Sequence, residues 1–178
     1  MQHKSEHLVI GSGIAGLCYA LSVAKHSSVT IITKRRQIDS NTWHAQGGIA
    51  AVTSKMDSFA EHLQDTLAAG DGLCNENIAK LVVENGPAQV KRLLSWGANF
   101  AKNSNSTLNL RAEGGHSNRR IVHAEDMSGQ EIQQTLLRAV AKHPNISIFE
   151  NHIAVNLITT EKLQLSQKNQ CLGAYVLD

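Results

Sequence analysis

Residues 11–16 (GSGIAG) have the spacing G-x-G-x-x-G, a pattern suited to holding a pyrophosphate. Gly11 permits a tight turn, Gly13 lets the backbone approach a phosphate closely, and Gly16 lets the following helix pack against the preceding strand. Free N–H groups and a partial positive charge at the start of that helix also attract phosphate oxygens. These residues therefore predict a dinucleotide site, with the pyrophosphate at the turn.

The segment after the second predicted strand departs from the usual dinucleotide pattern. Such sites often carry Asp or Glu there to bind a ribose hydroxyl, whereas this chain has Lys34, Arg35 and Arg36. A basic cluster at this place favours NADP, because arginine can bind the 2′-phosphate. On these residues alone, an NADP-dependent dehydrogenase remains an alternative.

The elements around the glycine turn alternate as in a βαβ unit. We predict strands at residues 7–10 and 28–33, separated by a buried helix at 17–26. A third parallel strand is predicted at 146–149, and residues 154–160 and 172–177 are predicted to be two strands of an antiparallel hairpin or meander. The fold class is therefore α/β, Rossmann-like, with a parallel sheet and antiparallel strands near the C-terminus.

Further helices are predicted from their capping residues. Ser58 and Glu61 form a capping-box pattern that opens a helix expected to end at Gly70. A helix capped by Asn75 is expected to stop near residue 86, and a separate helix is expected from residue 87 to 97, because Pro87 suits a first helical turn. The last helix is predicted from residue 128 to about 143.

Composition excludes several classes of protein. The chain has 178 residues, 42% hydrophobic and 18% charged, enough for one domain with a core. A net charge of +2 is too small to indicate nucleic-acid binding, and no apolar run is long enough to span a membrane. Residues 1–7 lack the apolar part of a signal peptide, so a cytoplasmic protein is expected. The three cysteines and nine histidines show no metal-binding spacing, so no metal site is expected.

Residues 40–51 (SNTWHAQGGIAA) resemble a signature of the flavoprotein family that contains the succinate dehydrogenase and fumarate reductase flavoprotein subunits and L-aspartate oxidase. Residues 65–70 (DTLAAG) and 111–124 (RAEGGHSNRRIVHA) are similar to the aspartate oxidase branch in particular. In this family a lysine like Lys34 commonly ends the second strand. The resemblance therefore implies a Rossmann-like FAD-binding domain, and the NADP alternative leaves residues 40–51 unexplained.

The resemblance also implies which residues hold FAD. In the respiratory flavoproteins a histidine at the position of Asn41 is bonded covalently to the flavin, so Asn41 implies FAD held non-covalently. Backbone groups after the third strand are expected to contact adenine. The implied FAD-binding residues are Gly11, Ser12, Gly13, Ile14, Ala15, Gly16, Lys34, Asn41, Thr42, Trp43, His44, Ala45, Gln46, Gly47, Gly48, Ile153 and Ala154.

The substrate implied by the resemblance is a small dicarboxylate, L-aspartate, oxidised to iminoaspartate for quinolinate and NAD biosynthesis. Fumarate or oxygen would reoxidise the flavin, and coupling to quinolinate synthase is a further expectation. Glu113 would face the substrate's amino group, since a carboxylate is a suitable partner for an ammonium. The alternative is a solvated loop carboxylate near Arg111, Arg119 and Arg120. We treat His116, Arg119, Arg120 and His123 first as residues that organise the loop.

The domain expected for residues 1–178 is the amino-terminal part of an FAD-binding domain. Members of the family are several hundred residues long, and their capping and helical domains and catalytic arginines are expected to lie outside this chain. The chain alone is therefore expected to bind FAD weakly or not at all, and not to turn over aspartate. A non-catalytic dinucleotide-binding module is the other alternative, although the three glycines of the turn are intact.

Overall fold

The computed structural model describes residues 2–165 and 168–178. Its contacts divide the chain into two compact units. Unit 1 comprises Met1–Trp43 and Leu136–Asp178, and unit 2 comprises His44–Thr135. Each unit is described separately below.

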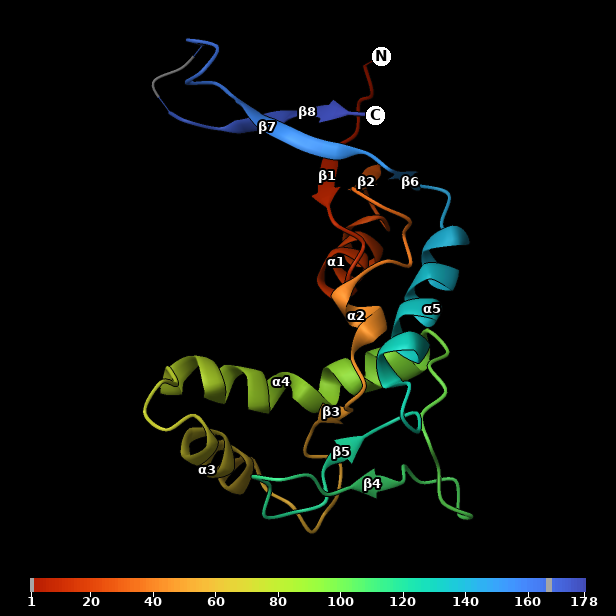
Figure 1. Cartoon of the computed structure of the whole chain (residues 1–178), viewed down its shortest axis with the longest axis vertical. Coiled ribbons are helices and arrows are strands. Elements are labelled where there is room, and N and C mark those ends of the chain that lie inside the picture. Colours follow the sequence, from red (N-terminus) through yellow and green to blue (C-terminus); the bar gives the residue numbers. More distant parts are fainter. Residues whose placement is uncertain (1, 166–167) are drawn as a thin grey trace. The chain divides into compact units, whose positions relative to one another are not determined.

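A parallel three-stranded sheet forms the centre of unit 1 (Figure 1). Its strands are β1 (His7–Ile10), β2 (Val29–Thr33) and β6 (Ile146–Glu150), in the order β1-β2-β6. Helix α1 (Ile14–Val23) joins β1 to β2 and buries Leu17 and Ala20 completely. The predicted βαβ unit and the third parallel strand are therefore confirmed.

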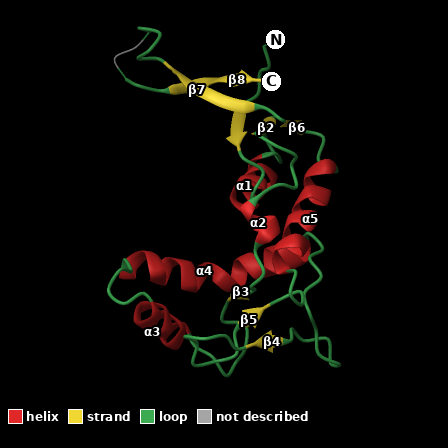
Figure 2. Cartoon of the chain, in the orientation of Figure 1, coloured by secondary structure: helices red, strands yellow, loops and turns green. Residues whose placement is uncertain are grey.

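Unit 1 also contains a long antiparallel pair, β7 (Ile153–Thr159) and β8 (Cys171–Leu177), drawn as yellow arrows in Figure 2. Ile153 pairs with Leu177 at one end and Thr159 with Cys171 at the other. This pair confirms the antiparallel pairing predicted for residues 154–160 and 172–177.

Two helices, α3 (Phe59–Ala69) and α4 (Glu76–Ser95), lie side by side in unit 2 (Figure 1). The Ser58 hydroxyl accepts a hydrogen bond from the Glu61 N–H at 3.2 Å and donates one to the Glu61 carboxylate at 2.8 Å. The Asn75 side chain accepts from the Ile78 N–H at 3.2 Å. Both predicted N-caps are confirmed.

The predicted break at residues 86–87 is wrong, because α4 continues through Pro87. Proline cannot donate the usual backbone hydrogen bond, which normally weakens a helix interior. Here Val83, Val90 and Leu93 are all buried on α4, and burying them favours one continuous helix. A Cβ added at Gly86 would make only an ordinary contact with the Ala51 Cβ, at 3.6 Å, and Gly86 lies inside the helix and not at its end.

A small antiparallel sheet in unit 2 was not predicted. It consists of β3 (Ile49–Ala50), β5 (Ile121–Val122) and β4 (Leu110–Arg111), in the order β3-β5-β4. Strands of two residues carry no periodic pattern that a sequence could reveal. This sheet nevertheless fixes both ends of the loop that contains Glu113.

Two helices complete the fold, α2 (Asn41–His44) and α5 (Ser128–Ala141). The three cysteines are free thiols. None of the helices formed by residues 2–165 and 168–178 has the length and apolar character needed to cross a bilayer.

Candidate FAD and substrate site

The glycine turn of unit 1 has the backbone geometry that its sequence predicts. Gly11 has a φ of +107°, in the region that favours glycine, and its N–H donates to the Ile32 carbonyl at 2.8 Å. A Cβ on Gly16 would lie 2.3 Å from the Gly11 carbonyl oxygen, so the helix can approach the turn this closely only with glycine here. Gly11 and Gly16 therefore build the turn itself.

The start of α1 beside Gly13 has the features that a pyrophosphate needs. A Cβ on Gly13 would meet only the Thr42 hydroxyl, at 3.5 Å, so the backbone is open on that side. The first turn of α1 contains no acidic residue, and its leading N–H groups lack partners within the helix. Thr42 accepts a hydrogen bond from the Ile14 N–H at 3.0 Å, and the buried Ser12 hydroxyl donates to Thr33 at 3.2 Å. These residues fit the phosphates of FAD.

The residues predicted to contact the adenosine part also come together in unit 1. The His152 N–H donates to the Thr33 carbonyl at 2.9 Å, and the Asn151 N–H donates to the Arg35 carbonyl at 3.3 Å. These bonds bring the end of β2, with the exposed Lys34, beside the start of β7, where Ile153 and Ala154 lie. Ligands of open α/β sheets bind at the carboxyl ends of such strands.

The predicted FAD segment 41–48 is divided between the two units. Asn41, Thr42 and Trp43 belong to unit 1, and residues 44–48 belong to unit 2. In unit 2 the Ala45 carbonyl accepts from the Gly129 N–H at 3.0 Å. A Cβ on Gly48 would lie 2.3 Å from the Val122 carbonyl oxygen, so glycine permits the close approach of β3 to β5. The close packing of the chain at Gly48 against β5 therefore requires a glycine there, whether or not a cofactor binds.

Glu113 lies in the exposed loop between β4 and β5 of unit 2. Its backbone carbonyl accepts from the His116 N–H at 3.3 Å, and its carboxylate has no hydrogen bond or ion pair within residues 2–165 and 168–178. Arg111 instead pairs with Glu125 at 2.7 Å and with Asp126 at 3.3 Å. The Glu113 carboxylate is therefore left available for a cationic partner.

A buried ionic network holds the other end of this loop. Arg120 is fully buried, and its Nε and Nη2 donate to the two carboxylate oxygens of Asp57 at 2.9 and 2.8 Å. Its Nη1 donates to Asp65, which also accepts from the N–H and the hydroxyl of Ser117, both at 2.8 Å. The bond from the Ser117 N–H, together with those from its hydroxyl and from Arg120, lowers the pKa of Asp65 to about 2.

The contacts of this network define the roles of Arg120 and His116 in the loop. Arg120 pairs with carboxylates other than Glu113, and His116 Nδ1 lies 3.3 Å from Arg120 Nη1. His62, also buried, has a lowered pKa, first because of burial and then because of the nearby Arg120 charge. Arg120 and His116 thus organise the loop, as predicted.

Our sequence reasoning did not identify the acidic half of the network. Asp57 and Asp65 stand eight residues apart, just before and within the predicted helix after Ser58, with Glu61 midway between them. That pattern was the available signal, but it could not reveal that Arg120, 55 residues further along than Asp65, is the partner.

Comparison with known proteins identifies the family to which this chain belongs. A family model described as an FAD binding domain matches residues 6–178 of the chain. The chain therefore belongs to this family, and its cofactor is FAD, as the resemblance of residues 40–51 implied. The basic residues 34–36 accordingly do not signify NADP.

Its most similar curated relatives include L-aspartate oxidases. L-aspartate oxidase 2-a, chloroplastic, of Nicotiana tabacum is 52% identical over 153 residues, which cover 86% of this chain and 24% of the relative. L-aspartate oxidase of Acinetobacter baylyi is 42% identical over 177 residues, which cover 99% of this chain and 32% of the relative. The chain thus spans about a quarter to a third of the length of these relatives.

Solved structures confirm the predicted fold class. The chain is similar to an E. coli quinol fumarate reductase, with a TM-score of 0.90, 28% identity, and coverage of 99% of this chain and 30% of that one. The Mycobacterium smegmatis Sdh1 complex gives a TM-score of 0.85 at 28% identity, covering 98% of this chain and 31% of that one. The fold is therefore that of the succinate dehydrogenase and fumarate reductase flavoproteins.

Proposed function

We propose that this chain supplies the amino-terminal part of the FAD-binding domain of an L-aspartate oxidase. The observation that carries the proposal is the turn at Gly13, where an open backbone and a helix N-terminus without acidic residues fit a pyrophosphate. The similarity to L-aspartate oxidases supports the choice of enzyme. Bound FAD would supply the hydride acceptor for substrate oxidation.

Glu113 gives the substrate proposal its chemical basis. Its carboxylate is exposed and unpartnered among the described residues, while Arg111 and Arg120 are neutralised by other carboxylates. An ammonium group is the partner such a carboxylate would bind. We infer that Glu113 binds the ammonium group of L-aspartate. The substrate would then lose a proton from its nitrogen to solvent and a hydride from its α-carbon to the flavin, which gives protonated iminoaspartate.

The mode of FAD attachment follows from the residue at position 41. Asn41 is exposed at the start of α2, and a side-chain amide does not form the covalent bond that a histidine can form with flavin. We propose that FAD is held non-covalently, by the residues of the turn and by residues 41–48. Oxygen or fumarate would accept the electrons, and the product would enter quinolinate and NAD biosynthesis.

The remaining groups that a dicarboxylate oxidase needs are proposed to lie outside this chain. Arginine side chains that bind the carboxylates and act at the reacting carbon are expected in the other two thirds to three quarters of such enzymes. We therefore propose that the chain alone binds FAD only weakly and does not turn over aspartate.

Competition between nucleotides tests the proposed function. Titrating the chain into FAD should quench flavin fluorescence, and NADP⁺ at the same concentration should not reverse the quenching. A double variant, Arg35→Gln with Arg36→Gln, should retain FAD affinity within about twofold, because exposed charges contribute little. Reversal by NADP⁺, together with loss of that reversal in the double variant, would instead establish the dehydrogenase alternative.

A further inference from the structure

Helix α3 supports the short turn that carries Glu113. The Glu113 carbonyl accepts from the His116 N–H at 3.3 Å, and Gly115 between them has a φ of +82°, which suits the third position of a type II turn. A Cβ on Gly115 would lie 3.7 Å from the Ala69 Cβ, so the turn approaches the last residue of α3. Glu113 is thus mounted on a turn that lies against this helix.

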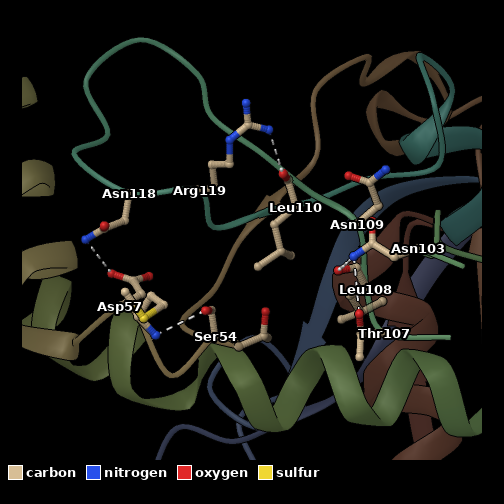
Figure 3. Close-up of a pocket in the computed structure, with 11 residues that line it drawn as sticks. Ser54, Asp57, Asn103, Thr107, Leu108, Asn109, Leu110, Asn118 and Arg119 are labelled. Carbon is tan, nitrogen blue, oxygen red and sulfur yellow. Dashed lines mark hydrogen bonds between the residues drawn. The ribbon is translucent and has the colours of Figure 1, made fainter. Parts of the chain in front are cut away.

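Two carboxylates hold the chain just after this turn. Asp65 of α3 accepts from the N–H and the hydroxyl of Ser117, both at 2.8 Å. Asn118 donates to Asp57, which precedes α3, at 3.2 Å (Figure 3). The position of the Glu113 turn therefore depends on its contacts with α3 and with the residue before that helix.

His62 lies on the same face of α3, three residues before Asp65, and is only 6% exposed. Its ring meets the His116 ring edge to face, with the ring centroids 5.8 Å apart. The His62 Nδ1 is buried and has no hydrogen-bond partner within residues 2–165 and 168–178. A neutral imidazole tolerates such burial, whereas a protonated ring would place a charged N–H where no acceptor lies.

The charges around His62 also oppose its protonation. Burial lowers the pKa of His62 below its ordinary value of 6.5, and the charges of Arg120 and His116 lower it further. The carboxylates of Asp57 and Asp65 act in the opposite direction, but each has a smaller effect. These groups face His62 from the loop, from the segment before α3 and from α3 itself. The packed arrangement therefore favours a neutral His62.

We propose that His62 is a pH-sensitive switch that controls the turn carrying Glu113. While His62 is neutral, its ring packs against His116 and the turn is held on α3. When His62 takes up a proton, the arrangement in which its ring reaches water becomes favoured, and residues 113–117 separate from α3. The switch itself needs no ligand. Its consequence for the substrate, a Glu113 carboxylate that is positioned only above the pKa of His62, rests on the proposed function.

Hydrogen exchange of the Ser117 amide, measured by NMR on the whole chain, reports the switch. Because packing lowers the pKa of His62, the packed state is fully favoured above pH 6.5 and loses stability as the pH falls below it. Opening that takes up one proton should lower the Ser117 protection factor by up to about tenfold between about pH 7.5 and about pH 5.5. Asp65 stays ionised throughout, because its hydrogen bonds, first of all that from the Ser117 N–H, lower its pKa to about 2.

Two variants that lack a titrating ring at position 62 should remove this pH dependence. His62→Phe keeps an aromatic ring against His116, and His62→Gln keeps a neutral polar side chain. In both, the Ser117 protection factor should change by less than about twofold between the two pH values, because neither side chain takes up a proton. His116→Gln is the matched control: it removes the other ring of the pair, and the pH dependence of the wild-type chain should persist.

A pH dependence that persists in both position-62 variants would overturn the inference, as would its loss in His116→Gln. The ring protons of His62 give a check that needs no substitution. Their titration midpoint in the wild-type chain should coincide with the loss of Ser117 protection, and two separate midpoints would contradict the switch. These measurements use neither FAD nor aspartate. Their failure would leave the proposed function standing, and failure of the chain to bind FAD would leave the switch standing.

Discussion

Replacing Arg120 by methionine should lower the free energy of unfolding of unit 2 by about 3–5 kcal/mol. The substitution removes the guanidinium that binds Asp57 through two hydrogen bonds and Asp65 through a third. The Asp57 side chain is only 1% exposed, so its charge would remain buried without a cationic partner. Urea denaturation followed by circular dichroism measures the loss.

Two comparisons show whether the buried charge causes the effect. Arg111→Met removes an arginine whose side chain is 43% exposed, and should cost no more than about 1 kcal/mol. Adding Asp57→Leu to Arg120→Met should recover part of the lost stability, because neither buried charge then remains. An Arg120→Met chain that unfolds at the same urea concentration as wild type would show that the network does not stabilise unit 2.

Substitutions in the glycine turn should separate folding from cofactor binding. Gly16→Ala should lower the free energy of unfolding by about 1–3 kcal/mol, because the added Cβ would lie 2.3 Å from the Gly11 carbonyl oxygen and force α1 away from the turn. Gly13→Val should leave stability nearly unchanged, because a Cβ there makes an ordinary contact with Thr42. It should nevertheless abolish FAD binding by occupying the space of the pyrophosphate.

Thermal unfolding and FAD fluorescence titration should be measured on the same samples. Gly114→Ala is the stability control, since a Cβ at Gly114 meets nothing within 4 Å. A Gly13→Val chain that binds FAD like wild type would show that the pyrophosphate does not lie at this turn. A Gly16→Ala chain as stable as the Gly114→Ala control would show that α1 tolerates a larger separation.

The sequence predicted the elements of unit 1 well because local patterns determine them. The short apolar strand, the glycine turn and the β-branched strand of residues 29–33 each carry their own signal, and the connection between them fits only a parallel pair. The predicted helix break at Pro87 was wrong for a different reason. Proline and glycine predict a break from local chemistry, whereas burial of Val83, Val90 and Leu93 keeps α4 continuous.

The candidate site was predictable only in part. The glycine turn follows from spacing, and the family resemblance supplied residues 41–48 and Glu113. The partners of Arg120 depend on the path of the chain, because Asp57 and Asp65 lie 63 and 55 residues earlier. Only the structure shows that Arg111 is paired with carboxylates, whereas Arg119 is exposed and donates to the Leu110 carbonyl.

The absorption spectrum of the chain equilibrated with FAD, recorded before and after acid precipitation, tests the proposed cofactor site most directly. The open turn at Gly13 and the amide at position 41 predict flavin bands that shift on binding, followed by release of all the flavin into the supernatant. Flavin retained in the precipitated protein would contradict non-covalent binding. A spectrum identical to that of free FAD would contradict the site itself.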